Sequence, residues 1–491
     1  MFVLFFLPLI AALGIAVAGM PPRHSLKVLA AVIPLQAFGA MEAGFTITPG
    51  YLVLCAILIG VLARGDVFVL ESSSSKRAAI FLGIAVAATI IAVGSSSLPQ
   101  TVLSEKMQYR AGPWRSPIQL ALLLFHFSLF FVVTRYIRDR SVADGLLKVH
   151  LTIALVLSVV GIYQVFAFTF GWPLADCTWS VKVSPGTAVV NYSAIRYYSA
   201  RVAEFSTRAT FSESRDFAEY LLSAVPILLA LAVSRSREIR QRFGFLASPA
   251  AAMIGLAAIF LTLSRSGWVF MALALVVIAV RLSPRLLLVH VPIAAGALSL
   301  FCLLLAKAGF FSPAASSLWD VLGGRLDWYY ILNDPRVNYY LVLWESFKSH
   351  PLLGLGAGNF AFWGAGYTGS DLLHSAHGFT WAALADFGVI GFAALAALFF
   401  GVFRKLHRAI KSSVRLSPRH VILAGIFAAL LATLFDAMTA GDRPQFHLIF
   451  LLGLAAAYPS IDQSSTRSAP DPSFPPEVLT GGPPGRAGIP S

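Results

Sequence analysis

The stretch from Phe245 to Arg281, FLASPAAAMIGLAAIFLTLSRSGWVFMALALVVIAVR, decides the class of fold. It is almost entirely apolar, and only the segment 264–267, Ser-Arg-Ser-Gly, interrupts it strongly near its middle. A helix rises about 1.5 Å per residue and the hydrocarbon core of a bilayer is about 30 Å thick, so the stretch is too long for one membrane span. It therefore predicts two spans joined by a tight hairpin, with Arg265 at its outer tip.

The composition of the whole chain extends this prediction. Of its 491 residues, 57% are hydrophobic and 12% are charged, whereas an ordinary soluble protein is roughly 25% charged. This excludes a disordered chain, a coiled coil and a soluble globular enzyme for most of the sequence. Apolar runs of about span length lie at 2–20, 26–42, 47–63, 78–94, 117–136, 149–171, 217–233, 246–263, 267–281, 286–308, 379–403, 420–438 and 445–459. The sequence predicts an all-α polytopic membrane protein with about 12–13 transmembrane helices.

The basic residues indicate how these helices are oriented. The formal net charge is +14, from 37 Lys and Arg against 23 Asp and Glu. With the N-terminus outside, 21 basic residues fall in six short cytoplasmic loops and two fall in the C-terminal tail. That bias follows the positive-inside rule. The remaining 14 basic residues lie on the outer side, where the rule does not explain them.

Two regions differ from the spans. Residues 309–378 are predicted to form a large periplasmic loop within a polytopic membrane domain, 1–460, and residues 461–491 a disordered Pro-rich cytoplasmic tail. Within the loop, apolar residues recur at helical spacing over 336–350 and predict an amphipathic helix that lies on the outer membrane face. Pro351 is expected to end that helix.

Arg265 is the first candidate for a functional residue. Its neighbours in the turn are small, and charge at membrane depth is costly and usually functional. The alternative is an interfacial anchor whose aliphatic stem lies along apolar surface while its charged end reaches water.

A second group of arginines, Arg201, Arg208 and Arg215, precedes the apolar run that begins at 217. Their spacing of seven residues would place them on roughly one side of a helix. Arginine forks match phosphate oxygens and keep their charge at any relevant pH, so the group predicts an anion site. A solvated basic loop, balanced by the acidic residues interspersed with the arginines, is the alternative.

His374 and His377 lie at the mouth of the run that begins at Phe379. A histidine at an interface is commonly a hydrogen-bonded structural residue, but beside outer arginines it could act as a general base near neutral pH. Asp386 would lie about 13 Å deeper than His377 in a continuous helix. An acid at that depth is expected to have a polar partner.

Several other kinds of site are disfavoured. No set of His, Cys, Asp and Glu has metal-ligand spacing, and we expect neither a metal nor a cofactor. The loop 354–358 resembles a dinucleotide loop but follows no predicted strand, and the scatter of basic residues over both faces disfavours nucleic acid. The chemistry that remains is transfer from an activated, lipid diphosphate-linked sugar. Arginines would stabilise the leaving diphosphate and a histidine would accept the proton of the acceptor hydroxyl.

Four segments, in order, resemble the O-antigen ligase / O-antigen polymerase superfamily of bacterial polytopic membrane glycosyltransferases. They are Arg208-Ala-Thr-Phe-Ser-Glu-Ser-Arg-Asp-Phe-Ala before a span, Leu261-Thr-Leu-Ser-Arg-Ser-Gly-Trp at the hairpin, Trp344 to Phe360 with its Pro-Leu-Leu-Gly-Leu-Gly-Ala-Gly run, and His377-Gly-Phe-Thr-Trp to Gly391. The chain departs from the family pattern at Ser212-Glu213 and at Arg215. It departs again at Gly378, where Asn is usual, and at Asp386, where Glu is usual.

The resemblance implies a GT-C-like membrane fold and a metal-independent glycosyltransferase in the bacterial inner membrane, with its active site facing the periplasm. The donor would be an undecaprenyl diphosphate-linked glycan. The acceptor would be lipid A-core or a protein for a ligase of lipopolysaccharide, or another lipid-linked glycan for a polymerase of surface polysaccharide or exopolysaccharide. By position, Arg208 and Arg265 would bind the diphosphate and His377 would activate the acceptor. Further candidates for substrate binding are Arg201, Arg215, Arg325, Arg336 and His374, the last being the alternative to His377.

A transporter or flippase of lipid-linked oligosaccharide is an alternative function, and a non-catalytic scaffold is another. A transporter typically has inverted repeats and charge near the membrane midplane. In this sequence the unexplained basic residues lie at one face, which favours an outward-facing reaction site.

Overall fold

The computed structural model describes most of the chain. The described residues are 12, 14–35, 38–42, 46–66, 70, 72–94, 115–170, 172–173, 179–184, 187–192, 207–211, 213–234, 236–282, 336–368, 376–439, 441 and 445–461. The predicted run 286–308, most of the run 2–20, the loop segment 309–335 and nearly all of the predicted tail therefore lie outside the described residues.

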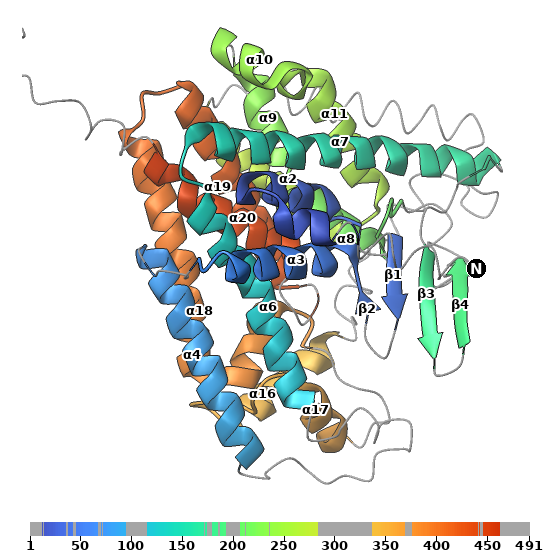
Figure 1. The fold of residues 1–491 in the computed structure, drawn as a ribbon, viewed down its shortest axis with the longest axis vertical. Coiled ribbons are helices and arrows are strands. Elements are labelled where there is room, and N and C mark those ends of the chain that lie inside the picture. The colour runs from blue at the N-terminus through green and yellow to red at the C-terminus, as the bar shows by residue number, and fades with distance from the viewer. Residues whose placement is uncertain are drawn as a thin grey trace, which may run out of the picture.

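Helices make up most of the described structure (Figure 1). Their bounds are α2 Pro22–Val32, α3 Pro49–Ala63, α4 Ser73–Gly94, α6 Arg115–Tyr136, α7 Arg140–Phe170, α8 Ser214–Leu222, α9 Val225–Val233, α10 Arg237–Phe243, η1 Gly244–Ala247, α11 Pro249–Leu261, α12 Arg265–Arg281, α16 Arg336–Ser349, α17 Phe360–Thr368, α18 Phe379–Ser412, α19 Pro418–Ala437, α20 Phe446–Ala457 and η3 Tyr458–Ser460. Among the described residues, six helical segments are long and apolar enough to cross a membrane, and a pair bent by 41° around residue 248 is a seventh candidate. The predicted helical, polytopic fold is confirmed.

The predicted hairpin is also confirmed. α11 ends at Leu261 and α12 begins at Arg265. Ser264 caps α12, because its hydroxyl oxygen accepts a hydrogen bond from the backbone N–H of Gly267 at 3.3 Å. Leu263 has a φ of +52°, in the left-handed region that non-glycine residues seldom adopt, and this conformation reverses the chain within a few residues.

The centre of the molecule is built from α8, α9 and α19. The apolar window of the segment Ser214–Val233 is 83% buried and that of α19 is 78% buried, against 33% for α4. Small residues let the central helices approach closely, since a Cβ added at Gly425 of α19 would lie 3.0 Å from the Cβ of Ala230 in α9. α4 instead exposes apolar side chains such as Ile80 and Ile90, as expected for a helix that faces lipid.

The described residues also include a four-stranded sheet, which was not predicted from the sequence. Its strands are β1 Phe38–Glu42, β2 Thr46–Ile47, β3 Trp179–Ser184 and β4 Thr187–Tyr192, in the order β2-β1-β3-β4, with β1 and β3 parallel. The predicted run 26–42 is therefore not one helix. α2 stops at Val32 and Pro34 follows, which has no backbone N–H with which to continue the helix.

The predicted amphipathic helix on the large loop is α16. Val342 and Leu343 are buried against the protein, whereas Leu341 is 61% exposed and Trp344 is 54% exposed. One side of the helix therefore packs on the protein, while an adjoining side presents the apolar side chains of Leu341 and Trp344 outward.

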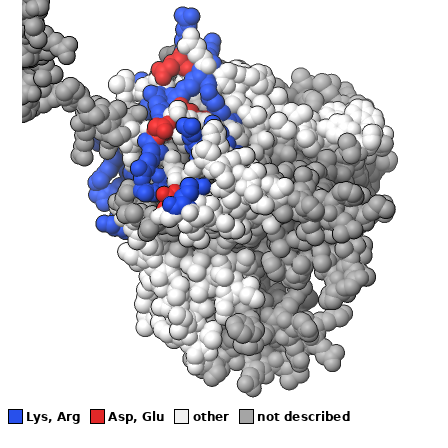
Figure 2. All heavy atoms as spheres, in the orientation of Figure 1, with Lys and Arg blue, Asp and Glu red and all other residues white. Residues whose placement is uncertain are grey.

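The basic residues in view gather at the end of the molecule where α10 lies (Figure 2). Arg242 of α10 forms an ion pair with Asp144 of α7, and Arg140 lies 3.4 Å from Glu238. α16 and α17 lie at the opposite end (Figure 1). Among the described residues, the Lys and Arg side chains in this view therefore lie mainly at the end that carries α10.

Candidate functional site

Four helix ends meet at the candidate site. A Cβ added at Gly267, in the first turn of α12, would lie 3.0 Å from the Cβ of Ala218, in the first turns of α8. A Cβ added at Gly378, immediately before α18, would collide with the carbonyl oxygen of Met438 at the end of α19. Arg215 of α8 donates to the carbonyl of Thr439 just after α19, which joins these two pairs. The structure thus brings together the starts of α8, α12 and α18 and the end of α19, and with them Arg215, Arg265 and His377.

Arg265 is the first residue of α12 and is half-buried. Within the part of the chain that the structure describes, its guanidinium has no hydrogen bond or ion pair. The neighbouring hydroxyls of Ser264 and Ser266 lie 3.2 Å apart. A helix N-terminus carries exposed N–H groups and the positive end of the helix dipole, so this position favours an anion.

Arg208 lies in a turn that is held from below by Gln164 of α7. The side-chain oxygen of Gln164 accepts hydrogen bonds from the N–H of Ala209 at 2.7 Å and from the hydroxyl of Thr207 at 3.1 Å, while its amide nitrogen donates to the Ala209 carbonyl at 3.0 Å. The N–H of Thr207 donates to the carbonyl of Leu261 at 3.1 Å, which joins this turn to the end of α11. The Arg208 turn and the Arg265 hairpin are therefore fixed side by side.

Gln164 was not among the functional residues predicted from the sequence. It lies inside the predicted run 149–171, where a single amide looks like a tolerated polar residue in a span. A buried amide in a membrane helix nevertheless has to find partners, and that expectation is the signal that could have identified it.

Arg215 reaches the end of α19. Its Nη2 donates to the backbone carbonyl of Thr439 and, at 3.1 Å, to the hydroxyl of the same residue. Thr439 therefore fixes the direction of the guanidinium. Because Met438 contacts Gly378, the end of α19 connects the Arg215 side chain to the loop that carries His377.

His377 is half-buried and has a φ of +45°. Its ring lies against Tyr339 of α16, with ring centroids 4.6 Å apart and an angle of 35° between the planes. The contact with the Met438 carbonyl explains why glycine follows His377 in this chain, because any side chain at Gly378 would displace the end of α19.

The glycine-rich loop before α17 is fixed by a carboxylate. The φ angles of Gly354, Gly356 and Gly358 are +66°, +82° and +69°, a left-handed conformation that glycine adopts at no steric cost. Asp386 of α18 accepts hydrogen bonds from the N–H of Gly358 at 2.7 Å and of Phe360 at 3.3 Å. These backbone donors are the polar partners expected for this buried acid, and they give the loop a structural role.

α18 is interrupted where this loop packs against it. Gly388 has a φ of +62° and a ψ of −167°, which are not helical values. The N–H of Val389 consequently donates to the carbonyl of Pro351 at 2.8 Å, outside its own helix. A Cβ at Gly388 would collide with the carbonyl of Leu352, so the close approach requires glycine. This junction sets the position of α16 and the glycine loop relative to the His377 loop.

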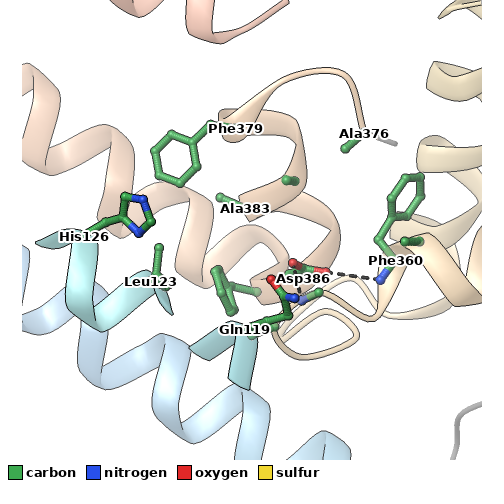
Figure 3. A pocket seen from close by; sticks show the side chains of 13 residues that line it. Gln119, Leu123, His126, Phe360, Ala376, Phe379, Ala383 and Asp386 are labelled. Carbon is green, nitrogen blue, oxygen red and sulfur yellow. Dashed lines mark hydrogen bonds between the residues drawn. The ribbon is translucent and has the colours of Figure 1, made fainter. Parts of the chain in front are cut away.

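A cavity of about 100 Å³ lies between α6, α17 and the start of α18 (Figure 3). Most of its lining is apolar, with Gln119, His126 and Asp386 as polar members. Ala376 and Phe379, which flank the His377 loop, also line it. The cavity therefore adjoins the predicted base.

The remaining predicted site residues are described only in part. Arg201, Arg325 and His374 lie outside the described residues, and for Arg336 the structure gives only its place as the first residue of α16. Among the described residues, no group of three or more His, Cys, Asp and Glu is placed to hold a metal ion.

Comparison with known proteins gives one family. Residues 250–396 match the family described as O-antigen ligase. The match covers less than a third of the 491 residues and includes the Arg265 hairpin, the glycine loop and the His377 loop, while Arg208 and Arg215 lie before it. It supports the O-antigen ligase / O-antigen polymerase superfamily that the four motifs resemble. No curated protein matches the chain.

Proposed function

We propose that this chain, which carries an O-antigen ligase segment, transfers glycan from an undecaprenyl diphosphate-linked donor at the periplasmic face of the bacterial inner membrane. The family match supports a membrane glycosyltransferase of the ligase or polymerase type in general. The observation that carries the finer proposal is the convergence of Arg208, Arg215 and Arg265 with His377 at the meeting point of four helix ends.

The arginines would bind the diphosphate of the donor. Arg265 offers a half-buried guanidinium at a helix N-terminus, with no protein partner among the described residues. Negative charge grows on the diphosphate as the bond between the sugar and the phosphate oxygen breaks. Fixed cations and N–H groups at that position stabilise the transition state more than the ground state.

His377 would act on the acceptor. Its imidazole would take the proton of an acceptor hydroxyl while the hydroxyl oxygen attacks the anomeric carbon of the donor sugar. The electron pair of the broken bond leaves with the prenyl diphosphate. Tyr339 and the Gly378–Met438 contact hold the ring in place during this step.

The periplasmic placement rests on charge. The basic end of the molecule carries α10, and α16 with α17 lies at the opposite end (Figure 1, Figure 2). Because basic loops remain in the cytoplasm, the opposite end would face the periplasm, where a lipid-linked donor supplies its own leaving group.

The test uses a bacterial strain from which the gene for this protein is deleted, and it measures the amount, chain length and lipid linkage of the glycan that accumulates. Wild type, Arg265→Ala, Arg208→Ala and His377→Ala are each returned at equal protein level, with Arg240→Ala of α10 as the control. We expect the control to restore the finished glycan and the three site variants to fail. Single lipid-linked units in the deletion strain would identify a polymerase, and full-length lipid-linked chains a ligase. Normal glycan in all three site variants would overturn the proposal.

A further inference from the structure

A buried polar cluster lies beneath Arg215. It consists of Glu219 of α8, Asp436 of α19 and His447 of α20, all 0% exposed. The Nε2 atom of His447 lies 3.3 Å from Oε1 of Glu219. In the described part of the chain, the carboxylate oxygens and ring nitrogens of these side chains make no hydrogen bond. Buried polar groups are nearly always paired in folded proteins, so three together need an explanation.

Arg215 is the cation that faces this cluster. It lies one helical turn before Glu219 on α8, a spacing that places the two side chains on the same face. Its charge acts on both Glu219 and Asp436. Ser266, which follows Arg265, lies beside Asp436. The cluster therefore lies directly beneath both the Arg215 and the Arg265 ends of the candidate site.

The other titratable groups around the cluster come from α7 and α8. Asp216 acts electrostatically on His447, and the ring of Tyr220 meets His447 edge-on at 5.9 Å between centroids. His150 of α7 also faces His447, and its Nε2 lies 3.1 Å from the hydroxyl of Ser223. Among the described residues, these groups add no second Lys or Arg to the cluster.

The charges of the cluster balance only with one additional proton. Asp216 is only half-buried and is left out of this balance, which covers the buried cluster and Arg215. The carboxylates of Glu219 and Asp436 against the single guanidinium of Arg215 leave one negative charge in excess when His447 is neutral. An unbalanced charge in a dry interior is strongly unfavourable. A proton held between Glu219 and His447, which lie within contact distance, removes the excess.

We propose that Glu219, Asp436 and His447 are positioning residues that hold Arg215 against Thr439 and bind one more proton when a diphosphate binds. This inference rests on the proposed function. In the free protein the carboxylates are the counter-charge of Arg215. A diphosphate that binds from the outer side becomes the counter-charge of Arg215 in place of the carboxylates. The negative charge of the carboxylates is then no longer balanced, and a proton taken from the solvent neutralises it. Donor affinity therefore falls as the pH rises.

The experiment uses the full chain in lipid nanodiscs and a short-chain prenyl diphosphate-linked sugar as the probe. The diphosphate diester of this probe has no proton to exchange near neutral pH, so proton uptake on binding reports on the protein. Calorimetry in two buffers of different ionisation enthalpy measures that uptake for the wild type, without acceptor and therefore without turnover. We expect net proton uptake.

Variants of similar size and shape show which residues cause the pH dependence of donor binding. Glu219→Gln is expected to retain the fold and to make the dissociation constant of the probe nearly independent of pH. Arg215→Lys keeps the charge but loses the fork, so it should raise KM for the donor about tenfold with a smaller change in kcat. Asp144→Asn is the matched control: it changes a buried acid at the basic end and should leave both the pH profile and KM as in the wild type.

The outcomes separate this inference from the proposed function. A wild type that neither binds the probe nor transfers glycan contradicts the proposed function itself. A wild type that binds and transfers, but takes up no proton, overturns the positioning role alone. The same conclusion follows if Glu219→Gln keeps the wild-type pH dependence. Because the calorimetry needs only the wild type, the inference stays testable even if every variant in the cluster misfolds.

Discussion

The two ends of the helical bundle use the same residue types in opposite ways. At the basic end, Asp144 is 7% exposed and is fully engaged, by the ion pair with Arg242 and by the hydroxyl of Tyr458 at 2.9 Å. At the other end, the buried Glu219 and Asp436 have no hydrogen bond among the described residues, and Arg265 has no ion pair there. A polar group whose hydrogen bonds are all made within the protein is typical of a structural site, whereas buried polar groups without hydrogen bonds are typical of a site that binds a ligand.

His377 and His407 provide the first way to test this contrast, and the one with the largest expected effect. His407 lies at the basic end, where its Nδ1 is 2.9 Å from Nη2 of Arg281. We expect His377→Ala to reduce kcat for glycan transfer by roughly 10²–10⁴-fold, the usual contribution of a general base. His407→Ala should stay within about twofold, because no group at that end takes part in transfer. Equal losses in the two variants, measured on purified protein, would remove the distinction between the ends.

Arg265 and Arg281 sharpen the comparison, because they begin and end the same helix, α12. Arg281 stacks on Phe427 at 5.2 Å and contacts His407, so its guanidinium has protein partners. We expect Arg265→Ala to reduce kcat/KM by about 10²–10³-fold, as loss of one electrostatic stabiliser of a leaving group does. Arg281→Ala should lower the midpoint of thermal unfolding slightly and leave kcat/KM unchanged. A larger kinetic loss in Arg281→Ala than in Arg265→Ala contradicts the assignment of the ends.

Gly378 and Gly83 test the packing that supports the site. A Cβ at Gly378 would collide with the Met438 carbonyl, whereas a Cβ at Gly83 of α4 has nothing within 4 Å. We expect Gly378→Ala to shift the His377 loop and to reduce kcat about tenfold, since misplacement by about 1 Å is costly in catalysis. Gly83→Ala should leave kcat unchanged and stabilise α4 slightly, by up to about 1 kcal/mol. Unchanged turnover in Gly378→Ala would show that the contact with α19 does not position His377.

The sequence was sufficient to predict the parts of this architecture that depend on local pattern. The Arg265 hairpin followed from the length of an apolar stretch, and α16 followed from helical spacing before a proline. The pairing of strands β1 and β3 could not be predicted, because it joins residues about 140 positions apart and leaves no local signal. The prediction of one span over 26–42 was wrong for a related reason, since its hydrophobicity fits a strand as well as a span and Pro34 prevents the helix from continuing.

In the candidate site, too, the residues that could be predicted are those with a local signal in the sequence. Arg208, Arg265 and His377 were predicted from charge at span ends and from motif resemblance, and the structure brings them to neighbouring helix ends. Gln164 and Thr439 were missed, because each acts through a backbone or side-chain contact with a residue far along the chain. The partner of Asp386 was expected, but the glycine loop was not identified as that partner, because a loop's backbone N–H groups cannot be placed before the fold is known.

The smallest expected effect belongs to Asp139, at the basic end just before α7. Its carboxylate accepts hydrogen bonds from the N–H of Val142 and the hydroxyl of Ser141, both at 2.8 Å. The hydrogen bond from the Val142 backbone is the main cause that lowers the pKa of Asp139 in the folded protein, and that from Ser141 adds to it. A carboxyl with a lowered folded-state pKa stabilises the fold above its unfolded pKa and loses that contribution as the pH falls.

Asp139→Ala should therefore reduce the stability of the protein by about 1 kcal/mol at neutral pH, the usual value for loss of a helix cap. The difference from wild type should shrink as the pH falls through the range in which Asp139 becomes protonated. Thermal unfolding at several pH values measures this, and glycan transfer per folded molecule should be unchanged at neutral pH. A loss of transfer without a loss of stability would show that the basic end contributes to the reaction, and the contrast between a structural end and a reactive end would then fail.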